Sequence, residues 1–461
     1  MAMRPARFAV EVWVICITVL RRRHLAAMGA AMADDEPVAP TRLTLRQRLA
    51  RNPLTRLGPG LITGVADDDP SGIATYSQAG AQFGLNMLWT MPVAYPLMAA
   101  VQSMCARLGR VTGRGLSANI KAQFPPVVLR TVVTLLLIAN TLNIAADVAA
   151  MGEAVELATN FDRHVATFLL VMVTLLLQVL VPYHRYVGVL KWLTLSLLAY
   201  ALVLLAIDVP WGEVLRRTVS PRFTLGAGAA TMIVAVFGMT ISPYLFFWQA
   251  SEEVEDLRGA PGLKADPANA RPELRRIAWD TWSGMFYSNI TSYFIILATG
   301  LTLGVAGVTE IDTAGQAAMA LKPLAGNFAA ILFTVGIIGV GLIGVPVLAG
   351  SGAYALAETM GWNEGLERKA VDARGFYGVI VISLLAALVI QYSPISAMRA
   401  LFWSAVINGL VAVPLLVVVI LLVSNRAVMG DFTAPAPIRW LGWVTVAVMA
   451  VAAGAMAVPL L

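Results

Sequence analysis

Charged residues are scarce in this chain. Only 13% of its 461 residues are Asp, Glu, Lys or Arg, whereas 58% are hydrophobic and the mean hydropathy is +0.75. This balance excludes a water-soluble globular domain and indicates a polytopic helical membrane protein. With roughly 20 residues per span and short loops, a chain of this length holds about eleven transmembrane helices.

Cysteine and histidine are also scarce. Two cysteines, Cys16 and Cys105, exclude a disulfide framework, and the three histidines form neither an HExxH motif nor a zinc cluster with cysteine. The sequence has no P-loop, Walker motif or catalytic-triad spacing, so we predict a non-enzyme without a cofactor. We attribute the net charge of +6 to residues that orient a membrane protein, not to nucleic-acid binding.

Eleven apolar segments are predicted to span the membrane, and together they make residues 51–461 a transmembrane domain. They cover residues 57–80, 86–106, 128–152, 165–183, 187–208, 226–250, 282–305, 328–357, 375–393, 397–424 and 438–460. Residues 1–50 are predicted to be a cytoplasmic extension. Its apolar run, residues 8–20, is too short to span, so it is either an interfacial helix or precedes a true translation start at Met28 or Met32.

The positive charges orient the chain. With a cytoplasmic N-terminus, 27 of the 33 arginines and lysines fall in inside segments and six fall outside. The positive-inside rule therefore predicts a cytoplasmic N-terminus and an external C-terminus in a bacterial-type inner (plasma) membrane. Residues 258–276 read as a flexible cytoplasmic loop, and the acids before it read as a solvated helix end or, alternatively, as an acidic exit funnel: Glu252, Glu253, Glu255 and Asp256.

The first predicted span is interrupted at its centre by three acids, a proline and a glycine: Asp67, Asp68, Asp69, Pro70 and Gly72. A carboxylate at membrane depth costs at least about 2.5 kcal/mol on insertion scales. Broken backbone survives at that depth only inside protein or along a polar cavity. The sixth span breaks at Pro243. Proline breaks at matching positions of two halves indicate an inverted-repeat transporter, with repeats near 57–208 and 226–424 and an extra helix at 438–460.

These two breaks resemble those of the Nramp family of divalent-metal transporters, and the resemblance covers roughly residues 50–425. The family's first helix carries Gly-Pro-Gly and, nine residues later, Asp-Pro-Gly-Asn, which correspond here to Gly58-Pro59-Gly60 and Asp69-Pro70-Ser71-Gly72. Its sixth-helix Met-Pro-His corresponds to Ser242-Pro243-Tyr244. The resemblance implies an all-α, LeuT-like fold of five plus five helices with an eleventh, and transport of a divalent metal by alternating access.

The resemblance also implies a metal site at the breaks. Asp69 is the retained carboxylate, Gly72 stands where the family has an Asn ligand, and Ser242 stands where it has a Met thioether. We predict a site composed of Asp69, Asp68, Ser242, Gly72, Asn408 and the freed carbonyls of Ala66 and Met239. The alternatives are that Asp69 caps a helix end, that Ser242 bonds its own helix, and that Asn408 makes an interhelical hydrogen bond.

Losing the sulfur ligand favours hard ions, since carboxylate, carbonyl and water suit Mg²⁺ or Mn²⁺. In this respect the chain is similar to the Nramp-related magnesium transporters. The proton path that the resemblance implies is depleted: Asp147 remains, but Ala150, Tyr244 and Gln249 replace the family's Glu and two histidines. The ninth span has no internal Arg or Lys. We therefore predict uptake of Mg²⁺ or Mn²⁺ without proton coupling.

Two other functions compete with this prediction. One is a transporter of the same fold for an amino acid or another organic cation, whose amine would pair with Asp69. The other is a channel or a membrane sensor that merely binds the ion. The sequence predicts a divalent metal ion and the lipid bilayer as partners, and it leaves the oligomeric state open.

Overall fold

The computed structural model describes residues 58–181, 194–222, 226–257, 259–268, 270–392 and 396–457. The chain divides into residues 1–56 and 57–461, so the predicted N-terminal extension lies outside the described residues. Throughout the described ranges the regular structure is helical, without strands. The predicted all-α class is therefore confirmed for this part of the chain.

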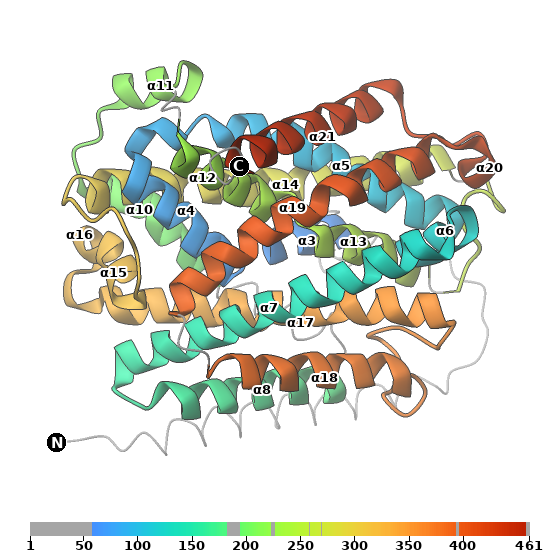
Figure 1. Cartoon of the computed structure of the whole chain (residues 1–461), viewed down its shortest axis with the longest axis horizontal. Helices are drawn as coiled ribbons and strands as arrows, with labels where there is room; N and C mark the ends of the chain where they lie inside the picture. The colour runs from blue at the N-terminus through green and yellow to red at the C-terminus, as the bar shows by residue number, and fades with distance from the viewer. Residues whose placement is uncertain are drawn as a thin grey trace, which may run out of the picture. The chain divides into compact units, whose positions relative to one another are not determined.

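The first half of the described chain contains the following helices (Figure 1): α3 Pro59–Asp67, α4 Pro70–Phe83, η2 Gly84–Met87, α5 Thr90–Thr112, α6 Leu116–Gln123, α7 Pro126–Thr159, α8 Arg163–Leu180, η3 Thr194–Leu197, α10 Leu198–Ala206 and α11 Trp211–Val219. The second half contains α12 Ala227–Thr240, α13 Pro243–Glu255, α14 Ala270–Thr299, η4 Gly300–Gly304, α15 Ala314–Ala318, η5 Met319–Leu321, α16 Lys322–Ala325, η6 Gly326–Phe328, α17 Ala329–Met360, α18 Arg374–Ile390, α19 Ala397–Ser424, α20 Arg426–Met429 and α21 Ala436–Ala457.

In the described residues, each predicted span coincides with a helix or a broken pair of helices. Residues 187–193 of the fifth span lie outside the described residues, as do residues 57, 182–183, 393 and 458–460 at the ends of other spans. Seven helical segments in the described part are long and apolar enough to cross a membrane. The prediction that 258–276 is a flexible loop is wrong in part, because α14 begins at Ala270. The first turns of α14 instead carry charged side chains that form ion pairs with α13 and α5.

Both proline breaks are present, between α3 and α4 and between α12 and α13. Pro70 and Pro243 each occupy the first turn of the second half-helix, where a missing backbone N–H removes no hydrogen bond. The broken pairs exchange neighbours: α4 packs against α14, and α13 packs against α5. Each broken helix thus lies on the second helix of the other repeat, as an inverted repeat requires.

Helices α3 and α14 touch through glycine. A Cβ added at Gly64 would lie 2.2 Å from the carbonyl oxygen of Gly284, and a Cβ added at Gly284 would lie 2.2 Å from the carbonyl oxygen of Gly60. Small residues let helix backbones approach closely in membranes, where van der Waals contact and not the hydrophobic effect holds helices together. This contact fixes α3, and with it the break, against α14.

Candidate metal site

Asp69 lies at the centre of the first break and is completely buried. It caps α4, because its Oδ1 accepts a hydrogen bond from the backbone N–H of Gly72 at 2.9 Å. Its Oδ2 accepts a hydrogen bond from the hydroxyl of Tyr244 on α13 at 3.1 Å. A Cβ added at Gly344 on α17 would lie 2.8 Å from the Cβ of Asp69, so glycine makes room for this carboxylate. Three helices therefore surround it.

The backbone at the breaks favours a cation. Helix α3 ends at Asp67 and α12 ends at Thr240, and each C-terminal end presents carbonyl oxygens that carry the negative end of a helix dipole. The predicted carbonyls are both at these ends. That of Ala66 lies 3.3 Å from the Tyr244 hydroxyl, and that of Met239 lies 2.6 Å from the Ser242 hydroxyl.

The structure brings the two breaks together at Gly72. A Cβ added there would lie 3.3 Å from the carbonyl oxygen of Asp67 and 3.7 Å from Cγ of Met239. Position 72, where the resembled family has an Asn ligand, therefore faces α12. The side chain of Met239 approaches the same space, so a thioether lies close to the break although position 242 carries none.

Ser242 and Asn408 keep their alternative interpretations. The Ser242 hydroxyl is within hydrogen-bond distance of the Gly238 carbonyl at 2.8 Å and of the Met239 carbonyl, both on α12. Its single proton is thus used locally, and its lone pairs remain as acceptors. Asn408 is buried on α19, next to Gly409, which contacts Val234 of α12. Its Nδ2 has no hydrogen-bond partner among the described residues, Asp69 included.

Asp68 faces away from these groups. Its Oδ1 lies 3.0 Å from the Ser288 hydroxyl and 3.4 Å from the Ser292 hydroxyl, both on α14. Asp67 has the same orientation, with its Oδ2 2.6 Å from the Ser288 hydroxyl. Three consecutive acids therefore divide between two sides of the break: Asp69 faces α13 and α17, and the other two face α14.

Sequence reasoning missed several polar groups near Asp69. Tyr244 was considered only as a residue that replaces a histidine, whereas its hydroxyl contacts the carboxylate directly. The contacts of Ser71 are not evident from the sequence either: its hydroxyl lies 2.9 Å from Oδ1 of Asp147 and 2.9 Å from Oδ1 of Asn143, both on α7. Ser404 of α19 donates to the same amide oxygen at 2.5 Å. The available signal was the set of polar residues Asn140, Asn143 and Asp147 at helical spacing within the membrane-spanning α7.

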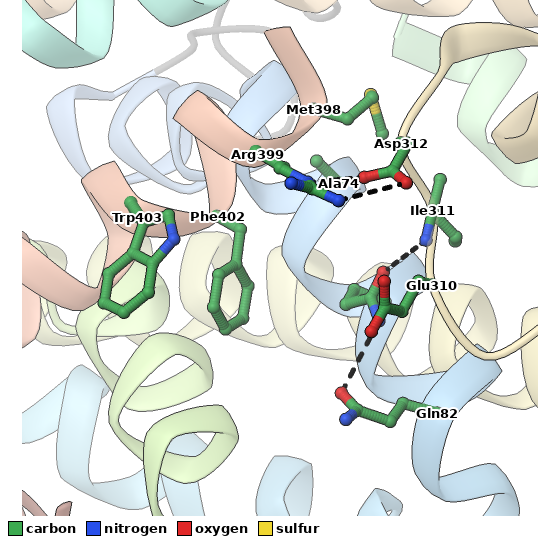
Figure 2. A pocket seen from close by; sticks show the side chains of 10 residues that line it. Ala74, Gln82, Glu310, Ile311, Asp312, Met398, Arg399, Phe402 and Trp403 are labelled. Atoms are coloured by element: carbon green, nitrogen blue, oxygen red, sulfur yellow. Dashed lines mark hydrogen bonds and ion pairs between the residues drawn. The ribbon is translucent and has the colours of Figure 1, made fainter. Parts of the chain in front are cut away.

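A polar cavity of about 370 Å³ lies near the C-terminal half of α4. Figure 2 shows Ala74 and Gln82 of α4 facing the Glu310–Asp312 loop and the start of α19, where Arg399 pairs with Asp312 at 2.7 Å. The side chains that line it therefore come from the first half of the chain and from its last repeat.

A second cavity, of about 770 Å³, lies at the C-terminal end of α13 and α17 and is strongly acidic. Among the described residues that line it, one base, Arg368, faces five acids: Glu255, Asp256, Glu358, Glu364 and Glu367. The prediction that the acids after the sixth span form a solvated helix end is wrong for Glu252 and Glu253, which are buried. Glu253 pairs with Arg276 at 3.1 Å. A funnel that concentrates cations remains a prediction for this acidic cavity.

Glu364, in the loop after α17, should make the stability of the protein depend on pH. Burial, with added repulsion from Glu358 and Glu255, raises the pKa of Glu364 to about 9. An acid with a raised folded-state pKa stabilises fully below its unfolded value, near 4.5, and this stability is lost as pH rises through about 9. We expect the thermal midpoint in detergent to fall over that window and to fall less in Glu364→Gln. The exposed Glu310→Gln is the control, and an equal slope in both variants would refute the assignment.

The geometry of the two breaks defines a class of protein. Two broken helices with exchanged neighbours, C-terminal carbonyls at the breaks and one buried carboxylate between them are the features of an inverted-repeat membrane transporter. Residues 60–459 match the family described as "Natural resistance-associated macrophage protein-like", so the chain belongs to this Nramp family. The predicted family is thus confirmed.

Individual relatives agree with this membership. A "Divalent metal cation transporter MntH" of Klebsiella pneumoniae is 27% identical over 405 residues, which cover 86% of this chain and 92% of that protein. A crystal structure of the Eremococcus coleocola manganese transporter has a TM-score of 0.71 at 15% identity, over 92% of this chain and 89% of that one. Mhp1, a nucleobase-cation-symport-1 family transporter, has a TM-score of 0.52 at 14% identity, over 87% and 92%. These two structures confirm the predicted LeuT-like fold.

Proposed function

We propose that this protein takes up hard divalent cations, Mg²⁺ or Mn²⁺, by alternating access and without proton coupling. Family membership and the divalent metal cation transporters among its relatives support a divalent metal as the cargo. One observation carries the preference for hard ions. The side-chain group that contacts Asp69 is an oxygen, the Tyr244 hydroxyl, which also lies beside the Ala66 carbonyl, and a hydroxyl replaces the family's thioether at position 242.

The same side chains support uncoupled transport. Asp147 is within reach of Asp69 through Ser71, but Ala150 next to it on α7 carries no titratable group. Gln249 on α13 accepts a hydrogen bond from Thr63 at 2.6 Å and does not titrate. A proton released near Asp69 therefore has no chain of carriers beyond Asp147 among these positions.

The orientation of the chain is part of the proposal. The excess of arginine and lysine in alternate loops supports a cytoplasmic N-terminus and an external C-terminus. The acidic cavity would then open to the cytoplasm and the polar cavity to the outside. A cation would enter past Gln78 and Gln82 and leave past Glu358 and Glu364.

Flux in liposomes tests the proposal. Purified protein is reconstituted, and entry of Mg²⁺, Mn²⁺, Cd²⁺ and radiolabelled amino acids is measured with a pH-sensitive dye inside. We expect entry of Mg²⁺ or Mn²⁺ without a pH change. Entry of an amino acid without metal entry would support the organic-solute alternative, and binding without any flux would support a sensor.

Ser242→Met should shift selectivity toward soft metals. The substitution adds a thioether at the sixth-helix break, so competition by Cd²⁺ against Mn²⁺ entry should strengthen on the order of tenfold. Met239→Leu is the matched control, because it removes the thioether already near Gly72. Ser242→Met could leave the competition of Cd²⁺ with Mn²⁺ unchanged while Met239→Leu abolishes it. In that case the sulfur that contacts the ion comes from position 239 and not from position 242.

A further inference from the structure

Asp67 and Asp68 form a second polar cluster, on the α14 side of the first break. Their side chains are 0% and 1% exposed, and the cluster also contains the buried Ser288 and Ser292 of α14 and Tyr76 of α4. None of the ion pairs in the described part of the chain involves either acid. Two carboxylates therefore lie side by side within the bundle without a basic partner, an arrangement that is costly unless a bound cation or a proton compensates it.

The hydroxyl protons cannot satisfy this cluster. Ser288 has one proton but lies within hydrogen-bond distance of both Oδ2 of Asp67, at 2.6 Å, and Oδ1 of Asp68, at 3.0 Å. Ser292 lies 3.0 Å from the carbonyl of Ser288, so its proton is drawn to its own helix and its lone pairs face Asp68. When both carboxyl groups are ionised, at least one oxygen–oxygen contact is therefore left without a proton between its atoms.

Three further oxygens at the cluster have no partner. Oδ1 of Asp67 and Oδ2 of Asp68 accept no hydrogen bond from any described residue. The hydroxyl of Tyr76 is fully buried, has no described residue at hydrogen-bond geometry, and faces Ser292 and both carboxylates. Tyr76 belongs to a different helix from the serines, so its unpartnered hydroxyl is an observation independent of the acid pair.

We propose that Asp67, Asp68, Ser288, Ser292 and Tyr76 form a second binding site for a hard divalent cation, separate from Asp69. The ligands are all oxygens, which Mg²⁺ and Mn²⁺ prefer. Two carboxylates neutralise two positive charges, whereas a single monovalent cation would leave one negative charge uncompensated in a low-dielectric interior. This inference rests on the proposed function, because it assigns the same class of ion to the second site.

Mn²⁺ binding to the full chain in detergent tests the proposal. Equilibrium dialysis gives the number of ions bound, and electron paramagnetic resonance detects broadening between two nearby Mn²⁺ ions. We expect two ions per wild-type chain and broadened spectra. Asp69→Asn and the double variant Asp67→Asn/Asp68→Asn should each bind one ion and give unbroadened spectra. Asp431→Asn, an exposed loop acid, should match wild type.

The outcomes separate this inference from the proposed function. One ion in wild type, lost in Asp69→Asn and retained in the double variant, overturns the second site and leaves the proposed function intact. Two ions that both persist in Asp69→Asn, with undiminished flux, refute the role of Asp69 instead. Should the double variant not fold, Ser288→Ala and Tyr76→Phe keep both charges. Each should weaken binding of the second ion about tenfold, and unchanged affinity in both overturns the site.

Discussion

Asp69→Ala is expected to abolish divalent-metal flux, by at least about 100-fold, while the protein stays folded. The carboxylate of Asp69 lies where α4, α13 and α17 meet. Without it, only carbonyl oxygens and neutral hydroxyls remain to take the place of the water molecules that a divalent ion loses when it binds. The measurement is Mn²⁺ and Mg²⁺ entry into liposomes, normalised to monodisperse reconstituted protein. Asp431→Ala, on an exposed loop, controls for the loss of an acid in general.

Asp69 has two roles that Asp69→Ala removes together, the proposed binding of metal and the capping of α4. A second substitution separates them. Asp69 also caps α4, and loss of an N-cap costs about 0.5–2 kcal/mol of stability. Asparagine caps helices as well as aspartate does, but it lacks the charge. We therefore expect Asp69→Asn to retain wild-type thermal stability and still lose transport. Wild-type flux in a stable Asp69→Asn protein would show that Asp69 is only a cap.

Metal entry is expected to follow the membrane potential and not the pH gradient. An ion with two charges gains about 4.6 kcal/mol per 100 mV of inside-negative potential, which corresponds to more than a thousandfold accumulation at equilibrium. Potassium-diffusion potentials of increasing size should therefore raise Mn²⁺ accumulation steeply. An imposed pH gradient should change Mn²⁺ accumulation little, because the side chains of Ala150 and Gln249 do not bind and release protons.

A metal-dependent pH change inside the liposomes would contradict this expectation. The control is Asp147→Asn, which removes the one retained acid of the family's proton path. If the pH change disappears in that variant, coupling runs through Asp147 and Ser71 by a route that the sequence does not reveal.

The spans and both breaks could be predicted because they depend on local chemistry. Apolar runs of membrane length, and Pro70 and Pro243 within them, fix where helices form and stop. The direction of three consecutive acids could not be predicted in this way. Asp68 (φ −87°, ψ 44°) and Asp69 (φ −68°, ψ 174°) have different backbone conformations, and Ser288, 220 positions away, receives the side chain of Asp68.

The ion pairs of Glu253, near the C-terminal end of α13, could not be predicted for the same reason. Glu253 reads as one of four surface acids, yet Arg110 of α5 and Arg276 of α14 both approach it. Likewise, the sequence shows Tyr244 only as a residue that replaces a histidine of the family. The fold shows that its hydroxyl lies between the Asp69 carboxylate and the Ala66 carbonyl. Long-range packing decides both cases, and one sequence does not encode it in any local pattern.

If the protein works by the proposed alternating access, the glycine contact between α3 and α14 constrains how it passes between its two open states. Gly60 and Gly64 meet Gly284 backbone to backbone, so no rotamer at this crossing can adjust to absorb a partial shift. The two helices must therefore either move together as one rigid body or separate completely. If they travel together, Asp67 and Asp68 stay against Ser288 throughout the cycle, and it is the distance from Asp69 to α13 and α17 that opens and closes.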